Sequence, residues 1–173
     1  MRRYSAALPP FLCSALFDFG DVHQPLHTVQ LFTREYPNGD RGGNEICIRV
    51  ALNQAPLDLH SLWDRVITSS NNVDRLRKIA NDLLSRFSAS SFRELDHAEP
   101  EAWAKESYEI ATKIAYENGS LRGTPKGQAR DCRAVNAVTY LSRGYPARAR
   151  LIADRRIYLA GYRLADLLTR LER

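Results

Sequence analysis

The chain has 173 residues, enough for one domain with a hydrophobic core of its own, and we expect a single domain over residues 1–173. Hydrophobic residues make up 44% and charged residues 26%, which is typical of a globular protein and excludes a low-complexity chain. The formal net charge of +5 suits a polyanionic partner without specifying one, and no apolar run reaches the length of a membrane span.

The first residues resemble a secretory signal peptide only faintly. Met1 is followed by two arginines and an apolar stretch, but the pair Pro9-Pro10 interrupts that stretch. Cleavage after it would fall almost at the histidine-rich motif described below. The sequence therefore assigns no compartment. Residues 11–19 are mostly apolar, and we expect a short buried helix there.

The chain contains three cysteines, Cys13, Cys47 and Cys132. None belongs to a C-x-x-C pair, which argues against a cysteine zinc site. The odd number leaves at least one thiol outside any internal disulfide. Two of the three could pair in an oxidising compartment, and the sequence does not indicate which two.

Three of the four histidines lie between residues 20 and 64, close to several aspartates. The first part of this stretch reads GDVHQPLH over residues 20–27. Pro25 cannot donate a helical hydrogen bond, and its ring crowds the carbonyl of Asp21, so a helix that enters the motif must bend or end. A bend allows the side chains of Asp21 and His27 to converge.

A turn-rich segment follows this motif. Residues 34–44 (REYPNGDRGGN) are rich in glycine, asparagine and proline, which favour tight turns. Apolar residues at positions 46, 48 and 50 then alternate with Cys47 and Arg49. This alternation predicts a short, half-buried strand within residues 45–51.

A second motif lies on the next predicted element. After Pro56, residues 57–68 are expected to form a helix with Asp58 as its N-cap. His60 and Asp64 are four residues apart on this helix. At 3.6 residues per turn they are only about 40° apart around the axis, so both point from the same face.

The remainder of the chain predicts helices, because apolar residues recur at helical spacing. Residues 119–128 are expected to form a loop. Helices are expected over residues 72–87, from Pro100 to about residue 118, over residues 129–142, and from about residue 146 to the C-terminus. The predicted fold class is therefore all-α, mainly helical, with one short strand or hairpin.

Positive charge gathers late in the chain. The simpler interpretation is a solvated helix face, and the alternative is contact with nucleic acid. The residues concerned are Arg130, Arg133, Arg143, Arg148, Arg150, Arg155 and Arg156.

The residues His27, His60 and Asp64 form a ligand set that zinc favours. Catalytic zinc commonly has three protein ligands from imidazole and carboxylate groups, with water in an open position. Asp21 could supply a fourth carboxylate or a bridge to a second metal. The pair His60 and Asp64 alone is more often a surface pair than a metal site, and the pair His23 and His27, which Pro25 interrupts, is also a weak signal. Together, with a glycine loop between them, the two pairs indicate a metal site and ordinary surface pairs equally.

The motif at residues 20–27 resembles the most recognisable motif of the zinc-dependent single-strand-specific nucleases, the S1/P1 nuclease family. Later segments match in the same order: DRGGN at 40–44, LHSLWD at 59–64 and LAGYRLADLL at 159–168. The resemblance runs from Gly20 to about Arg170. It implies a mainly helical fold shared with bacterial zinc phospholipases C, and a site of three zinc ions. Such a site hydrolyses phosphodiesters of RNA and single-stranded DNA, usually in a secreted or periplasmic protein.

The same resemblance implies roles for the metal-site residues. His27, His60 and Asp64 match the three protein ligands of one zinc ion. Asp21 matches the catalytic carboxylate that bridges the other two.

The resemblance also implies a substrate loop. Gly42 and Asn44 match the loop that holds a nucleobase, with Arg41 at its rim. His23 lies inside the first motif but is not a family ligand, and we expect a buried structural histidine that is hydrogen-bonded to the backbone. His97 matches nothing and is expected on the surface.

Three features depart from the family pattern. Phe17 stands where members carry a zinc-ligating histidine, four residues before Asp21, and it cannot bind metal. The family's N-terminal half, which holds the remaining ligands, has no counterpart in this sequence. Residues 1–19 also read unlike the family. A truncated start or divergence to a smaller protein explains all three, and the sequence keeps full ligands for about one zinc ion.

These observations agree with three alternative functions. The first is a zinc-dependent endonuclease for single-stranded DNA and RNA, truncated and impaired by an incomplete metal cluster. The second is a non-catalytic fragment or binding protein that one zinc ion stabilises. The third is a phospholipase-C-like phosphodiesterase, against which the glycine–asparagine loop argues. If the elements of the family's N-terminal half are missing, the helical core should also expose apolar surface. This exposure predicts self-association.

Overall fold

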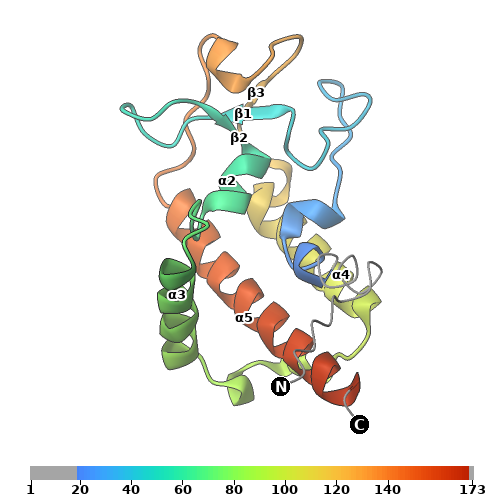
Figure 1. Cartoon of the computed structure of the whole chain (residues 1–173). Coiled ribbons are helices and arrows are strands. Elements are labelled where there is room, and N and C mark those ends of the chain that lie inside the picture. Colours follow the sequence, from blue (N-terminus) through green and yellow to red (C-terminus); the bar gives the residue numbers. More distant parts are fainter. Residues whose placement is uncertain (1–18, 172–173) are drawn as a thin grey trace, which may run out of the picture.

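The computed structural model describes residues 19–171, which are mainly helical with one small sheet (Figure 1). The sheet lies beyond one end of helix α5, and α3 and α4 lie on opposite sides of that helix (Figure 1). The predicted fold class is therefore confirmed. The strands are β1 (Ile46–Ile48), β2 (Leu57–Asp58) and β3 (Thr124–Pro125), and the α-helices are α2 (Leu59–Arg65), α3 (Val73–Arg86), α4 (Pro100–Ile110) and α5 (Tyr145–Leu171).

Local capping signals determine where several helices begin. The Asp58 carboxylate accepts a hydrogen bond from the backbone N–H of Ser61 at 2.7 Å, so Asp58 caps α2 as predicted. The Asn72 side chain caps α3 in the same way. Pro100 occupies the first turn of α4, where its missing N–H costs nothing. None of the helices that the structure describes combines the length and the apolar character of a membrane span.

Helix α4 continues into a π-helical turn over Ala111–Ala115. The backbone N–H of Tyr116 closes this turn by donating to the carbonyl of Ala111 at 2.8 Å. The extra residue in the turn rotates the chain that follows relative to a regular α-helix. The side chain of Tyr116 consequently points into the protein, where it is 3% exposed.

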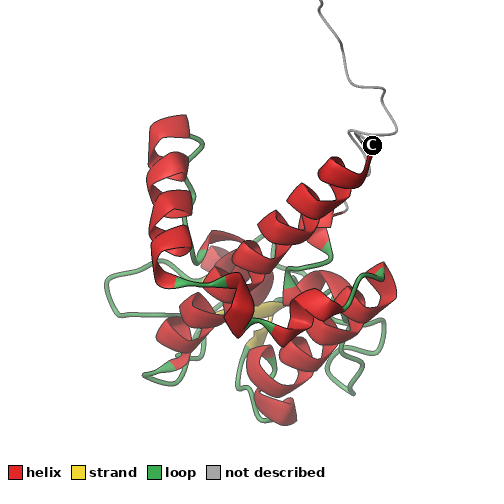
Figure 2. Cartoon of the chain, turned by 90° about the horizontal axis from the view of Figure 1, so that it is seen from below, coloured by secondary structure: helices red, strands yellow, loops and turns green. Residues whose placement is uncertain are grey.

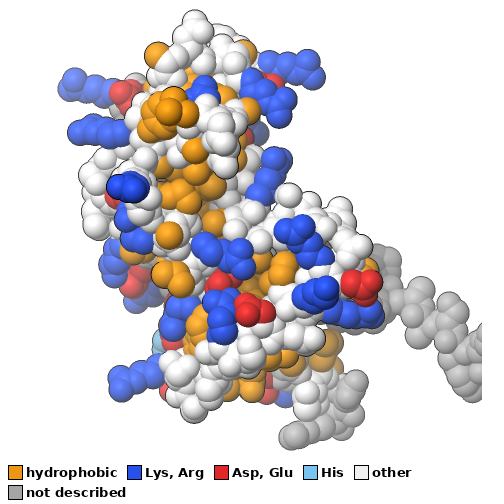
Figure 3. Space-filling view, turned by 90° about the vertical axis from the view of Figure 1, so that its left-hand side faces the viewer, with side chains coloured by type: hydrophobic (Ala, Val, Ile, Leu, Met, Phe, Trp, Pro, Cys, Tyr) orange, Lys and Arg blue, Asp and Glu red, His pale blue; other side chains and the backbone are white. Residues whose placement is uncertain are grey.

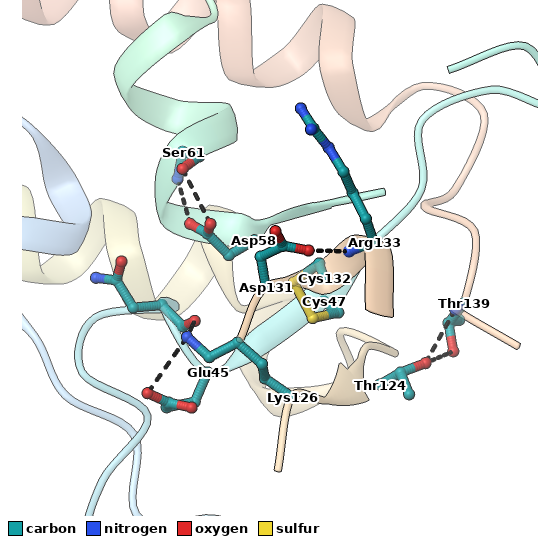
Figure 4. Close-up of a disulfide and its surroundings, with 11 residues drawn as sticks. Glu45, Cys47, Asp58, Ser61, Thr124, Lys126, Asp131, Cys132, Arg133 and Thr139 are labelled. Carbon is teal, nitrogen blue, oxygen red and sulfur yellow. Dashed lines mark hydrogen bonds and ion pairs between the residues drawn. A yellow bond between two sulfur atoms is a disulfide. The ribbon is translucent and has the colours of Figure 1, made fainter. Parts of the chain in front are cut away.

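The sheet has the order β2-β1-β3 with antiparallel pairing, and Cys47 lies opposite both Asp58 and Thr124. The strand predicted within residues 45–51 is confirmed, but all three residues of β1 are buried, so the prediction that it is half-buried is wrong. Ile46 and Ile48 belong to the main core. The other face of the strand is covered because Cys47 forms a disulfide with Cys132 (Figure 4).

The helix predicted over residues 129–142 is also wrong. The structure has a short 3-10 turn at Cys132–Ala134, followed by an extended segment. The backbone N–H of Arg49 donates to the carbonyl of Thr139, and the N–H of Leu141 donates to the carbonyl of Arg49. The disulfide and this pairing with the chain after β1 override the helical periodicity of the segment.

The main core lies between the sheet, α2, the π turn and the start of α5. Trp63 of α2 donates its indole N–H to the hydroxyl of Tyr145 at 2.9 Å, and that hydroxyl donates to the carbonyl of Ala115. A second core joins α3 to α5 through Leu83, Phe92, Tyr158 and Leu159. Helix α5 therefore connects the two cores.

A buried ion cluster joins α4 to α5. Arg156 and Arg163 are only 4% and 5% exposed, and both donate to the carboxylate of Glu106 at 2.7–3.0 Å. The interpretation of the late arginines as a solvated helix face is therefore wrong for Arg156, because its guanidinium faces α4. We refer to Glu106, Arg156 and Arg163 as the Glu106 cluster.

The Glu106 cluster predicts a specific loss of stability in acid. Burial alone would raise the pKa of Glu106, but hydrogen bonds from Arg163, Arg156 and His97 outweigh it and lower the pKa from 4.5 to about 2. The folded state thus holds this carboxylate ionised where the unfolded chain binds a proton. The stabilisation by ionised Glu106 is complete above pH 4.5 and is lost as the pH falls toward 2. The free energy of unfolding then changes by at most about 1.4 kcal/mol per pH unit. Urea unfolding across this window measures the slope, and it should flatten in a Glu106→Gln variant.

An apolar groove of about 630 Å³ separates α3 from α5. The two helices diverge in Figure 2. Figure 3 shows the side of the molecule that carries α3, where hydrophobic side chains are exposed between basic and acidic ones. Leu84 of α3 and Ile157 of α5 are 60% and 47% exposed. Asp64 also borders the groove. Apolar surface is exposed here as expected, and self-association stays a prediction.

Candidate metal centre

The first motif adopts the interrupted backbone that Pro25 predicts. Residues 19–21 are helical, and the helix ends at Asp21. A 3-10 turn then spans Pro25–Thr28, capped by the side chain of Gln24. This turn brings His27 back toward Asp21, with 3.6 Å between His27 Nδ1 and Asp21 Oδ1. Of the helix predicted over residues 11–19, all but Phe19 lies outside the described residues.

Three side chains from the two motifs converge. His27 Nε2 is 3.4 Å from one Asp64 oxygen, and His60 Nε2 is 3.5 Å from the other. The two imidazole rings stack with centroids 4.9 Å apart. The potential ligand atoms all lie within 4.8 Å of one another, and no other such group of three occurs within residues 19–171. The predicted sharing of a helix face by His60 and Asp64 is confirmed.

This trio fits the requirements of a zinc ion. Zinc bonds of 2.0–2.2 Å place tetrahedral ligand atoms about 3.3 Å apart, close to the two distances to Asp64. The carbonyl of Gly42 can only accept, so His60 donates to it from Nδ1 at 2.8 Å and keeps the lone pair of Nε2 free. In a neutral His60 the nitrogen without a proton is then Nε2, which lies 3.5 Å from Asp64.

The electrostatics of Asp64 favour an anionic ligand. Burial alone would raise its pKa, but hydrogen bonds with His27 and Gln24 outweigh burial and lower the pKa. Gln24 donates from Nε2 to Asp64 Oδ1 at 2.9 Å and holds the carboxylate in place. The hydrogen bond with Asp64 in turn raises the pKa of His27. The pair therefore attracts positive charge to this point of the surface.

Most of the other predicted site residues lie at one pocket, and Asn44 does not. A surface pocket of about 690 Å³ is lined by His27 and His60 together with Asp21, Arg41 and Gly42. Asp21 lies beside the opposite nitrogen of His27 and outside the trio. The side chain of Asn44, which does not line the pocket, donates to the carbonyl of Arg41 at 2.8 Å.

The two remaining histidines have structural environments. His23 is 2% exposed and donates from Nδ1 to the carbonyl of Phe19, so the predicted buried structural histidine is confirmed. Its Nε2 accepts from Arg163, and burial lowers the pKa of His23 to about 4. The side chain of His97 is 55% exposed, as expected, and lies 3.0 Å from Glu106.

Sequence reasoning missed the residues that hold the motifs in place. Ser107 donates to the carbonyl of Val22, and Arg156 donates to the carbonyl of His23. Asp40 accepts from the hydroxyl of Tyr116. An aspartate followed by Arg-Gly-Gly could have indicated a turn stabilised by its carboxylate. No local pattern indicates the partners on α4 and α5.

A model of the S1/P1 nuclease family matches residues 12–173. The chain belongs to this family. Endonuclease 5 of Arabidopsis thaliana is 32% identical over 168 residues, which cover 88% of this chain and 47% of the relative. Endonuclease 4 of the same plant is 29% identical over 165 residues, with the same coverage. The chain thus spans about half the length of these two relatives, and the family resemblance seen in the motifs is confirmed.

Proposed function

We propose that this S1/P1 family member is a zinc-dependent endonuclease that hydrolyses phosphodiester bonds of single-stranded DNA and RNA. The observation that carries the proposal is the convergence of His27, His60 and Asp64 beside an open pocket. Family membership and two relatives named as endonucleases support the reaction class. The activity is a proposal because the chain spans about half of those relatives.

Each proposed role follows from a position in the site. His27, His60 and Asp64 would hold one zinc ion, and such an ion polarises a phosphoryl oxygen and acidifies water. The hydrogen bond from Gln24 keeps the Asp64 carboxylate turned toward the two imidazoles. Asp21, with a 57% exposed side chain beside His27, is the proposed catalytic carboxylate and ligand of a further metal ion.

The pocket wall is the proposed substrate-binding surface. Arg41 has a 73% exposed side chain and would pair with phosphate at the rim. Gly42 presents backbone without a side chain, which suits a stacked or edge-bound base. Asn44 would have to release the carbonyl of Arg41 before its amide could reach a base.

The metal content of the chain is expected to limit its rate. One trio would hold about one zinc ion, which lacks the clamp on both attacking and leaving oxygens that a multi-metal site provides. The alternative is a non-catalytic protein that a single zinc ion stabilises. The disulfide between Cys47 and Cys132 supports an oxidising compartment in either case.

The test combines metal analysis with a cleavage assay. Protein purified without chelator is expected to contain about one zinc ion per chain and to cut single-stranded oligonucleotides faster than duplexes. Chelator should stop the cutting, and added zinc should restore it. Zinc binding without turnover on any nucleic acid would favour the non-catalytic alternative. Turnover of a phosphocholine ester alone would favour the phospholipase-like one. Absence of zinc and turnover would refute the proposal.

A substitution in the trio gives a sharper result. Asp64→Asn removes the anionic ligand and is expected to weaken zinc binding by more than the roughly 10- to 100-fold typical of losing a residue that only hydrogen-bonds to a ligand. Asp74→Asn is the matched control, because Asp74 is 82% exposed and, within residues 19–171, pairs only with Arg77. Competition titration against a chromophoric chelator measures both affinities. Equal affinities in the two variants would exclude Asp64 as a ligand.

A further inference from the structure

Asp40 is a fully buried carboxylate that has no cationic partner among the described residues. It is 0% exposed, and no Lys, Arg or His side chain forms an ion pair with it within residues 19–171. A buried charge of this kind is costly unless hydrogen bonds satisfy it. Four donors do so, and none of them is charged.

The four donors come from three separate segments. One Asp40 oxygen accepts from the backbone N–H of Leu31 at 2.8 Å and of Gly42 at 3.1 Å. The other accepts from the N–H of Gly43 at 2.8 Å and from the hydroxyl of Tyr116 at 2.6 Å. Burial, reinforced by the Asp40 carboxylate, raises the pKa of Tyr116, so the hydroxyl stays protonated and donates.

The loop that Asp40 holds in place contacts the imidazole of His60. Residues Arg41, Gly42 and Gly43 have positive φ angles of 56°, 63° and 87°, which wrap successive N–H groups around the carboxylate. The same turn directs the carbonyl of Gly42 toward His60 Nδ1, 2.8 Å away. A Cβ at Gly42 would collide with the carbonyl of Leu26, so the loop has little freedom to shift.

Tyr116 reaches Asp40 because of the π turn that ends α4. The turn closes with the bond from Tyr116 N–H to the carbonyl of Ala111. Without the inserted residue, the side chain at this position would point about 100° away around the helix axis. The π turn thus couples α4 to the loop that faces the candidate metal centre.

We propose that Tyr116 is a positioning residue for His60, acting through Asp40 and the carbonyl of Gly42. The chain of hydrogen bonds fixes His60 as the tautomer with its proton on Nδ1 and directs Nε2 toward Asp64. The functional part of this inference rests on the proposed zinc site. The tautomer of His60 in metal-free protein does not depend on it.

The test compares two buried tyrosines. Tyr116→Phe removes only the hydroxyl that contacts Asp40. Tyr145→Phe is the matched control, because Tyr145 is 1% exposed and its hydroxyl makes two hydrogen bonds outside this chain of contacts. Correlation of imidazole nitrogen and carbon-bound hydrogen signals by NMR reports the His60 tautomer without metal. Competition titration reports zinc affinity.

The expected results separate positioning from general stability. Wild type and Tyr145→Phe should keep the Nδ1 proton on His60, whereas Tyr116→Phe should shift population to the other tautomer. Zinc affinity should fall about tenfold in Tyr116→Phe and stay within about twofold of wild type in Tyr145→Phe. An unchanged tautomer and affinity in a folded Tyr116→Phe would overturn the inference.

Two further outcomes remain decisive. If Tyr116→Phe does not fold, Asp40→Asn tests the same contacts, because an amide nitrogen would then face a hydrogen-bond donor. It should shift the His60 tautomer in the same direction, and an unchanged tautomer would overturn the inference. If wild type binds no zinc, the proposed function fails, while the tautomer comparison still decides the role of Tyr116.

Discussion

Replacing Glu106 by glutamine is expected to lower the free energy of unfolding by about 3–5 kcal/mol. The carboxylate accepts hydrogen bonds from Arg156 and Arg163, two guanidinium groups that are almost fully buried. An amide cannot neutralise them, so both cations would stay in the interior without a counter-charge. Burial already lowers the pKa of Arg156, and the bond to Glu106 offsets this only in part.

Glu109 supplies the matched control on the same helix. It is 48% exposed and pairs with Lys113 at the surface, so Glu109→Gln should leave stability nearly unchanged. Urea unfolding followed by circular dichroism compares the two variants. Similar unfolding midpoints in Glu106→Gln and Glu109→Gln would show that the buried arginines do not depend on Glu106.

Removing the disulfide is expected to cost about 4 kcal/mol. The bond between Cys47 and Cys132 closes a loop of 85 residues, and a crosslink of that span restricts the unfolded chain strongly. It also holds the extended segment after Cys132 against β1, where Cys47 is fully buried. Reduction therefore frees a segment whose sequence has helical periodicity but which forms no helix in the fold.

The measurement compares urea unfolding with and without reductant, and repeats it for Cys47→Ser. The reductant should lower stability in the wild type and have no effect on the variant. Cys13→Ser is the control, because Cys13 lies outside the described residues and takes no part in this bond. A wild-type loss below about 1 kcal/mol would contradict the expected contribution.

The geometry of the candidate metal centre could be predicted because local rules govern it. His60 and Asp64 share a face through helical spacing alone, and Pro25 forces the break that returns His27 to Asp21. Asp58 likewise indicated the start of α2. Such signals act within a few residues and do not depend on the rest of the fold.

The failures involve contacts between distant parts of the chain. The segment 129–142 has helical spacing, but its disulfide partner is 85 residues away. Arg156 and Arg163 look like surface residues until α4 places Glu106 against them. Asp40 and Tyr116 are 76 residues apart and meet only because of a π turn, which no sequence pattern indicated.

The Glu106 cluster also connects the first motif to residues that are synthesised much later. Arg163 bonds to His23 across 140 residues, and Arg156 holds the backbone of the same turn. Contacts of such long sequence separation form late in folding. We therefore expect the turn that carries Asp21 and His27 to reach its final form only after Arg163 has left the ribosome. A nascent chain that ends before Arg156 lacks both hydrogen bonds to this turn.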